Sequence, residues 1–371
     1  MQYSELAALK HQIAVGCGLP FNVYRRDFSL LLARGQILTS QPELESLLQR
    51  GALVDLAELQ SASDRVRLAS PAQLPALWHH SLQQLAAALS ASTQPGFIAA
   101  LDEVTPVVLS LIARDKDLAI FQIIKRNDGE HLQYGVKHAL RCAITSFLVA
   151  QRLGWQDEES HKAFKVALTM DLSILALQGE LAEQTTPLTT EQRAAVHAHP
   201  LRSEEMLSLA GIGDPEWLQA VARHHETPSG KGYPLGLREP GDLATLAQRA
   251  DTYTAMLTPR LGRAAMAADK AGRMMFMQDG THPITAALVK EFGLYPPGCF
   301  VRLASGETGV VVKRGASVMT PIVAALTTPF GATLPQAIRR DTAERGYCIH
   351  AVLGDCGQLE RMQPEALMAM N

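Results

Sequence analysis

The chain has 371 residues, which corresponds to two or three domains of ordinary size. Apolar residues make up 47% of it and charged residues 19%, a composition that excludes disordered and collagen-like proteins. The formal net charge of -3 supplies no strong positive field, so composition gives no reason to expect DNA or an acidic membrane as partner.

The cysteines indicate a reducing compartment. They are odd in number and form no C-x-x-C pair, so neither a disulfide framework nor a cysteine-rich zinc site is expected. The first residues lack the apolar core of a signal peptide, and no stretch approaches the ~20 apolar residues of a membrane span. We therefore expect a cytoplasmic protein. The cysteines are Cys17, Cys142, Cys299, Cys348 and Cys356.

The first part of the chain divides into two predicted segments. Residues 1–58 predict a small β/α module, in which 20–24 and 29–38 form a hairpin and a helix follows from about residue 41 to 50. Residues 59–130 carry Leu and Ala at helical spacing and predict a helical linker or bundle.

Residues 131–292 form the largest predicted segment, with apolar residues at helical spacing almost throughout. One helix is expected to begin at Asp214, because Asp caps free amides and the following Pro215 is tolerated at the first helical position. Residues 293–371 change to short apolar strands and predict a second small β module. The predicted fold is mainly α, with small β modules at both ends.

Two adjacent histidines, His224 and His225, are predicted at the end of the helix that begins at Asp214. The sequence from residue 224 to 237 is HHETPSGKGYPLGL, a Gly/Pro-rich loop. Neighbouring residues lie about 100° apart around a regular helix, so both imidazoles can face one metal only at a fraying end. The pair alone fits a capped helix with chance histidines equally well, and the loop favours the metal interpretation.

This loop resembles the signature of the HD-GYP family, a branch of the HD-domain metal-dependent phosphohydrolases whose usual substrate is the bacterial messenger cyclic-di-GMP. Upstream, His138 looks like the family's first ligand histidine, and His199, followed by Pro200, looks like a later one. Downstream, Asp251 looks like the last ligand aspartate. Single helical histidines are more often packed or surface residues, but their joint occurrence in family order argues against that alternative. The resemblance covers about residues 132–260 and implies an HD-domain helical bundle.

The chain departs from the family at its name-giving His-Asp pair. The sequence there is Met170-Asp171, so the aspartate is kept and the histidine is lost. The family's Gly-Lys beyond the pair is replaced by Ser173-Ile174, which removes a cation that would assist phosphate chemistry. Asp171 lies in an apolar run, and an unpaired buried carboxylate is costly, so we expect a metal or histidine partner. The structural alternative is a bond to helix amides or a pair with Lys165 or a nearby arginine.

The complete family site is expected to hold two metal ions that share an aspartate and activate water for attack on phosphorus. By resemblance, the first ion would use His138, position 170, Asp171 and Asp251. The second would use Asp171, which is also the predicted catalytic residue, with His199, His224 and His225. A thioether is a weak, soft ligand, so Met170 is expected to weaken or empty the first site. We expect one divalent ion rather than two, of iron, manganese, zinc or nickel.

The loop after the histidine pair is the predicted ligand- or partner-binding segment. Its glycines allow close backbone approach, a tyrosine can stack, and a lysine attracts phosphate. In the family this loop is associated with the substrate cleft and with diguanylate-cyclase domains; a surface turn without a partner is the alternative. The residues concerned are Glu226, Gly230, Lys231, Gly232, Tyr233 and Pro234.

The resemblance implies a bacterial cyclic-di-GMP signalling protein on a phosphodiesterase scaffold. Removing one preorganised charge-stabilising group costs ~10²–10³ in rate, so weak or absent hydrolysis is expected from the loss of two. A non-catalytic adaptor for nucleotide or protein and a hydrolase for another phosphoester are the alternatives. The expected partners are cyclic-di-GMP or a related nucleotide, a diguanylate-cyclase domain and a second copy of the chain.

Overall fold

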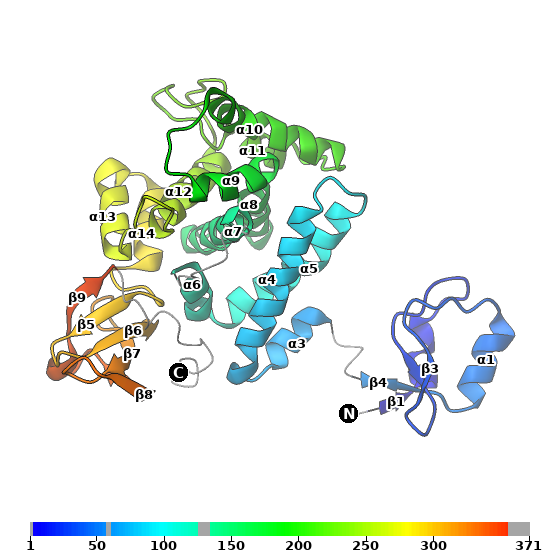
Figure 1. Cartoon of the computed structure of the whole chain (residues 1–371). Helices are drawn as coiled ribbons and strands as arrows, with labels where there is room; N and C mark the ends of the chain where they lie inside the picture. The colour runs from blue at the N-terminus through cyan, green and yellow to red at the C-terminus, as the bar shows by residue number, and fades with distance from the viewer. Residues whose placement is uncertain (1–2, 57–60, 125–133, 355–371) are drawn as a thin grey trace. The chain divides into compact units, whose positions relative to one another are not determined.

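The computed structural model of the chain describes residues 3–56, 61–124 and 134–354 (Figure 1). Its packing separates two compact units, Met1–Ala69 and Ser70–Asn371. Within the described ranges no helix has the length and apolar character required to cross a membrane. Several stretches at the ends of the predicted segments lie outside the described residues, namely 59–60, 125–133 and 355–371. The last of these includes Cys356.

A small antiparallel sheet organises the first unit. Its strands lie in the order β1 (Tyr3–Glu5), β4 (Leu53–Asp55), β2 (Val23–Tyr24) and β3 (Leu30–Leu32). The 3-10 helix η1 (Leu6–Gln12) and the helices α1 (Gln41–Gln49) and α3 (Ala62–Leu68) complete the unit. Phe21, Val23, Leu44 and Val54 are among the buried residues of its core. The predicted hairpin and helix are confirmed.

The second unit is a helical bundle. Its helices are α4 (Leu74–Ser90), α5 (Phe97–Arg114), α6 (Lys116–Ile124), α7 (Tyr134–Leu153), α8 (Asp157–Thr169), α9 (Leu175–Glu183), α10 (Thr190–Leu209), α11 (Pro215–Arg223), α12 (Asp242–Leu257), α13 (Ala268–Asp279) and α14 (Pro283–Phe292), with the 3-10 turns η2 (Pro71–Gln73) and η4 (Leu172–Ile174). Helix α7 lies at the centre, packed against α8, α9, α12 and α14. Nearly all of its side chains are buried, as expected for a helix that is apolar on most sides.

The helices that deliver the site begin at clear capping residues. Helix α10 starts after Thr189, whose hydroxyl accepts from the backbone N–H of Gln192. Helix α11 starts after Asp214, which accepts from the backbone N–H groups of Glu216 and Trp217, so the predicted start is confirmed. The helix ends at Arg223, directly before the histidine pair.

The helices that precede the core pack against one another and against it. Helices α4 and α5 pack against each other, α4 touches α7, and α6 contacts both α7 and strand β6. Helix α5 buries Leu101, Val108 and Ile112 completely. An apolar face of this extent is stable only against a partner surface, and the core provides it.

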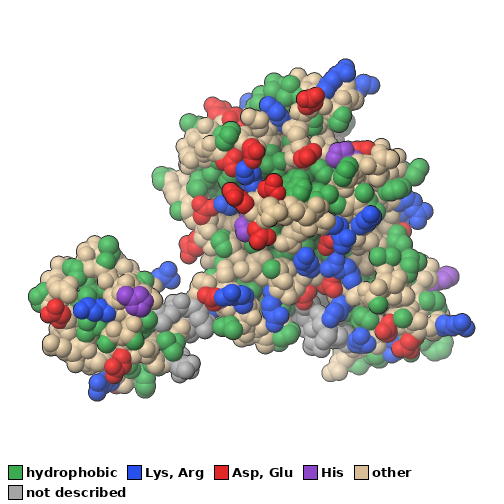
Figure 2. Space-filling model, turned by 180° about the vertical axis from the view of Figure 1, so that it is seen from behind, with side chains coloured by type: hydrophobic (Ala, Val, Ile, Leu, Met, Phe, Trp, Pro, Cys, Tyr) green, Lys and Arg blue, Asp and Glu red, His purple; other side chains and the backbone are tan. Residues whose placement is uncertain are grey.

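An antiparallel sheet closes the second unit next to α6 (Figure 1). Its strands lie in the order β8 (Thr333–Asp341), β7 (Ile322–Thr327), β6 (Thr308–Lys313), β5 (Phe300–Leu303) and β9 (Ile349–Leu353), with the 3-10 turn η5 (Arg345–Tyr347) before β9. The guanidinium of Arg314 ties this sheet to the helices through Asp117 and Glu291. The predicted fold class, a helical core with small β modules, is confirmed. Figure 2 shows acidic and basic side chains intermixed on one face of the molecule, in line with the small net charge.

Candidate metal centre

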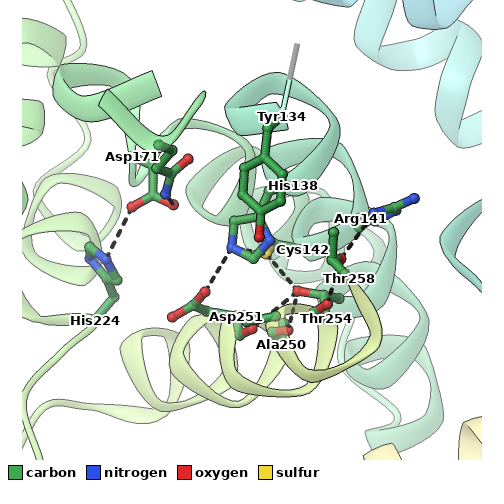
Figure 3. A network of polar contacts seen from close by, with 12 residues as sticks. Tyr134, His138, Arg141, Cys142, Asp171, His224, Ala250, Asp251, Thr254 and Thr258 are labelled. Carbon is green, nitrogen blue, oxygen red and sulfur yellow. Dashed lines mark hydrogen bonds and ion pairs between the residues drawn. The ribbon is translucent and has the colours of Figure 1, made fainter. Parts of the chain in front are cut away.

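The predicted ligand residues come from different helices and meet at one place in the bundle. Helix α7 contributes His138, α10 contributes His199 and α12 contributes Asp251, while Asp171 precedes η4 and the histidine pair follows α11. They form two groups, which we call the histidine cluster (Asp171, His199, His224 and His225) and the thiol cluster (His138, Cys142 and Asp251). Figure 3 shows Asp171, His138 and Asp251 turned toward the same space.

The histidine cluster has the dimensions of one face of a metal coordination shell. The Nε2 atoms of His199 and His224 lie 3.1 Å apart, and Asp171 Oδ1 lies 3.1 Å from the first and 3.7 Å from the second. Ligand atoms at about 2.0–2.2 Å from a shared ion are separated by about 3.0–3.6 Å. The ring nitrogens of His199, His224 and His225 all fall within 4.8 Å of one another.

The sequence around His199 sets the orientation of its ring. Pro200 has no N–H, so the carbonyl of Val196 loses its regular helical partner. His199 Nδ1 lies 2.6 Å from that carbonyl oxygen. Because a carbonyl can only accept, Nδ1 carries the proton and donates it. This bond turns Nε2 toward the cluster, in the arrangement typical of a metal-binding histidine.

The end of α11 sets the orientation of the His224 ring in the same way. The carbonyl of Val221 lies in the last turn, where carbonyls lack intrahelical partners, and His224 Nδ1 donates to it over 2.7 Å. His224 Nε2 therefore also faces the cluster. Two imidazole nitrogens and a carboxylate oxygen then point at one another inside the protein, which is unfavourable unless a cation or a proton lies among them.

Charges in the cluster follow from burial and from these contacts. Burial opposes the ionisation of Asp171, but hydrogen bonds from His199 and His224 hold the pKa of its carboxyl well below the ordinary value. Burial likewise works against protonation of His199, and the bond and charge of Asp171 outweigh it and raise the pKa of that imidazole. His225 has no such partner, so burial and the nearby charge of His224 lower its pKa to about 3.

The predicted loop closes over the histidine pair. The buried carboxylate of Glu226 accepts from the backbone N–H groups of Leu235, Gly236 and Leu237 at 2.7, 3.0 and 2.8 Å. At Gly232 a Cβ atom would lie 2.5 Å from the Cα of Glu226, so only glycine allows this close approach.

Tyr233 connects this loop to the cluster through ring stacking. Its ring lies 4.5 Å from that of His225, nearly parallel, and 5.1 Å from that of His197. Burial raises the pKa of Tyr233. Gly230 has a positive φ of 71°, while Lys231 is exposed and Pro234 half-buried. The loop therefore presents its cation to solvent and its aromatic ring to the histidines.

The thiol cluster lies on helices α7 and α12. His138 Nε2 is 2.8 Å from Asp251 Oδ1 and 3.5 Å from Cys142 Sγ. Cys142 Sγ is also 3.1 Å from the hydroxyl of Thr254 (Figure 3). Burial raises the pKa of the Cys142 thiol, and burial also opposes the ionisation of Asp251, whose pKa is nevertheless lowered by His138.

The positions that depart from the family are buried. Met170 is fully enclosed and Ile174 keeps 7% of its surface exposed. Ser173, in place of the family's glycine, donates from its hydroxyl to the carbonyl of His199 at 3.1 Å and ties η4 to α10. The amide of Gln178 donates to Asp171 Oδ2 over 2.8 Å, so this second oxygen already has a protein partner.

Two residues near the site had no role in the sequence-based prediction. Cys142 was set aside because it belongs to no C-x-x-C pair, although it lies four residues after His138 and hence on the same helix face. The guanidinium of Arg260 lies 5.1 Å over the ring of Tyr134, which in turn stacks on His138 at 6.1 Å. Only the tertiary structure shows that the positive charge of Arg260 lies close to the ring that stacks on His138.

Comparisons with known proteins agree with the fold. A family model described as HD domain matches residues 129–283. Cyclic di-GMP phosphodiesterase PA4108 of Pseudomonas aeruginosa is 28% identical over 229 residues, which cover 60% of this chain and 54% of that protein. The 3'3'-cGAMP-specific phosphodiesterase 3 of Vibrio cholerae is 30% identical over 173 residues, covering 44% and 36%. The chain thus spans about half or less of the length of these relatives.

Among solved structures, Bd1817, an HDG"Y"P protein from Bdellovibrio bacteriovorus, aligns with a TM-score of 0.51. The alignment covers 78% of this chain and 98% of that one at 16% identity, which shows a shared fold. Residues 129–283 match the HD-domain family, and their His/Asp clusters are candidate metal-binding groups. The motif resemblance to HD-GYP proteins agrees with these similarities.

Proposed function

We propose that the chain is a bacterial cyclic-di-GMP signalling protein whose HD-GYP centre binds one catalytic-type divalent ion and hydrolyses its ligand weakly or not at all. The proposal adopts the site assignment made from sequence: His138, Asp171, His199, His224, His225 and Asp251 as metal-site residues, with Asp171 as catalytic residue. The curated relatives named as cyclic-dinucleotide phosphodiesterases support the ligand class. A cytoplasmic location belongs to the same proposal.

One observation supports the proposed metal site. Backbone carbonyls hold both His199 and His224 so that their Nε2 atoms face Asp171 Oδ1. These residues would hold the ion, with His225 completing the set. When bound, a divalent ion there acidifies water and neutralises charge on phosphoryl oxygens. The protein's own part is to fix the ring orientations and to keep Asp171 ionised.

Weak hydrolysis is supported by what surrounds Asp171. Gln178 occupies the oxygen that would have to bridge to a second ion, and Met170 offers only a soft thioether. Ile174 provides no cation. The loss of two charge-stabilising groups, each worth ~10²–10³ in rate, predicts a large deficit relative to a complete site.

The adaptor function is the second candidate, because the protein's own contacts support the loop. The carboxylate of Glu226 accepts from backbone N–H groups of the loop, and Gly232 allows its close backbone approach. Lys231 and Leu235 are exposed at its edge, where a nucleotide phosphate or a protein surface could meet them. Such a loop keeps its binding surface even where turnover is lost.

The test is to incubate the full chain with cyclic-di-GMP and Mn²⁺ or Fe²⁺ and to quantify the linear product by chromatography. We expect slow turnover, or none, and about one tightly bound Mn²⁺ per chain. Asp171→Ala should abolish any turnover and the bound ion, whereas Glu103→Ala, on the exposed face of α5, should change neither. Absence of bound metal in the unchanged protein would refute the metal centre, and turnover that survives Asp171→Ala would place the chemistry elsewhere.

A further inference from the structure

The thiol cluster contains a possible ligand that the family resemblance does not supply. Cys142 is completely buried on α7 and lies one helical turn after His138. Its sulfur faces the same His138 nitrogen that faces Asp251. The ligand set implied by the resemblance contains no cysteine, so this thiol lies beside the place where Met170 removes a histidine.

The distances suit a thiolate-containing metal site. For an ion with bonds of about 2.05 Å to nitrogen and 2.3 Å to sulfur, tetrahedral geometry places the two ligand atoms about 3.6 Å apart. His138 Nε2 and Cys142 Sγ are 3.5 Å apart. His138 Nε2 and Asp251 Oδ1, at 2.8 Å, would separate by about half an ångström on binding an ion. All three ligand atoms lie within 4.8 Å of one another.

We infer that Cys142, His138 and Asp251 form a separate site for a thiophilic divalent ion such as Zn²⁺ or Co²⁺, with Cys142 taking over from the lost histidine at position 170. This extends the proposed function, since both take the helical core to bind metal. Sulfur selects against Mn²⁺, which prefers oxygen and imidazole ligands. The chain should therefore bind one Mn²⁺, at the histidine cluster, but two Zn²⁺ ions.

The surroundings provide both access and a supporting contact. Asp251 keeps 20% of its side chain exposed, so the cluster reaches solvent at this carboxylate. Thr254 now donates to the carbonyl of Ala250 at 2.8 Å and accepts from the thiol. When the thiol loses its proton to solvent on binding an ion, the same hydroxyl can turn and donate to the thiolate.

The competing explanation is a hydrogen-bonded network without metal, in which the thiol only bridges Thr254 and His138. The two explanations differ in what bound Co²⁺ would show. A cobalt–thiolate bond produces an intense charge-transfer band in the near ultraviolet, which imidazole and carboxylate ligands do not. Zinc-edge X-ray absorption would likewise show a sulfur neighbour at about 2.3 Å.

The experiment titrates the full-length, chelator-treated protein with Co²⁺, Zn²⁺ and Mn²⁺ and compares it with single variants. We expect the cobalt band in the unchanged protein, its loss in Cys142→Ser, and a fall in bound Zn²⁺ from about two ions to about one. Cys348→Ser, which removes an exposed thiol, should leave the band and the zinc content unchanged. His224→Ala should keep the band while losing the Mn²⁺ ion.

The outcomes separate the two proposals. The inference is overturned if the protein binds stoichiometric Co²⁺ without the charge-transfer band, or if the band persists in Cys142→Ser. Either result leaves the proposed ion at the histidine cluster unaffected. A band without Mn²⁺ binding overturns the proposed histidine-cluster ion and leaves the thiolate site standing. If Cys142→Ser fails to fold, X-ray absorption on zinc bound to the unchanged protein decides, since absence of a sulfur neighbour excludes the thiolate ligand.

Discussion

The side-chain amide of Gln178 donates a hydrogen bond to Asp171 Oδ2 over 2.8 Å, while Asp171 Oδ1 faces His199 and His224. The two oxygens of one carboxylate therefore have different roles. Oδ1 belongs to the histidine cluster, and Oδ2 is engaged by the protein. This asymmetry is what the proposed single-ion site requires, because only Oδ1 is left to face an ion among the histidines.

Replacing Gln178 tests this relationship. Gln178→Ala removes the donor that orients the carboxylate, and loss of such a supporting contact typically costs 10- to 100-fold in metal affinity. We expect Mn²⁺ binding to weaken by about that factor in a calorimetric titration. Gln83→Ala, on the exposed side of α4, is the matched control and should bind as the unchanged protein does. Equal affinity in both variants would mean that Gln178 does not orient the ligand.

Several residues of the site could be predicted from the sequence. The positions of His138, His199, His224, His225 and Asp251 were predicted from motif order, and the bundle brings them together as two clusters. The orientation of His199 was also present in the sequence, because the adjacent proline leaves a carbonyl without its helical donor. These features depend on local chemistry, which a sequence displays directly.

Other features depend on contacts that the spacing of residues does not display. The bond from Gln178 on α9 to Asp171 needs the turn through η4, and Cys142 on α7 meets Thr254 on the distant helix α12. Searching for C-x-x-C pairs could not find Cys142, although its spacing of four from His138 was a usable signal. The choice between a linker and a bundle over 74–124 was left open by the sequence, because helical spacing shows that a face is apolar but not which surface covers it.

The close approach at Gly232 gives a prediction on stability and on the site together. In Gly232→Ala the new Cβ would collide with backbone atoms of His225 and Glu226, so the loop must shift. We expect the free energy of unfolding to fall by about 1–3 kcal/mol and Mn²⁺ binding to weaken, since Tyr233 and His225 move with the loop. Urea unfolding and metal titration measure both effects.

Gly213→Ala is the matched control for that loop substitution. A Cβ at Gly213 meets nothing within 4 Å, so the change should stay within about 0.5 kcal/mol. If the two alanine variants unfold at the same denaturant concentration, then the loop is not constrained by the contact at Gly232.

Metal affinity should rise with pH. Asp171 raises the pKa of His199, so at low pH its Nε2 carries a proton that must leave when an ion binds. Below that raised pKa, affinity should fall by about tenfold per pH unit for each proton displaced. His225, with a pKa of about 3, is already neutral and adds no dependence near neutrality.

Dissociation constants for Mn²⁺ measured from pH 5.5 to 8.5 check this slope, as does proton release in buffers of different ionisation enthalpy. His79→Gln, an exposed histidine on α4, should reproduce the same pH profile. A flat profile across the whole range would show that no ligand proton is displaced.

Restoring the lost family residues provides the strongest test of why hydrolysis is expected to be weak. Met170→His puts an imidazole next to Asp171. We expect the number of tightly bound Mn²⁺ ions to rise from about one toward two. Turnover of cyclic-di-GMP should increase by at least ~10-fold. Ile174→Lys adds the missing cation, but position 174 is only 7% exposed, so the ammonium is stabilised only where it reaches phosphate or solvent. The double variant should therefore be faster than Met170→His alone and less stable to urea. A double variant that folds and still shows no gain in turnover would mean that the departures from the family site reach beyond positions 170 and 174.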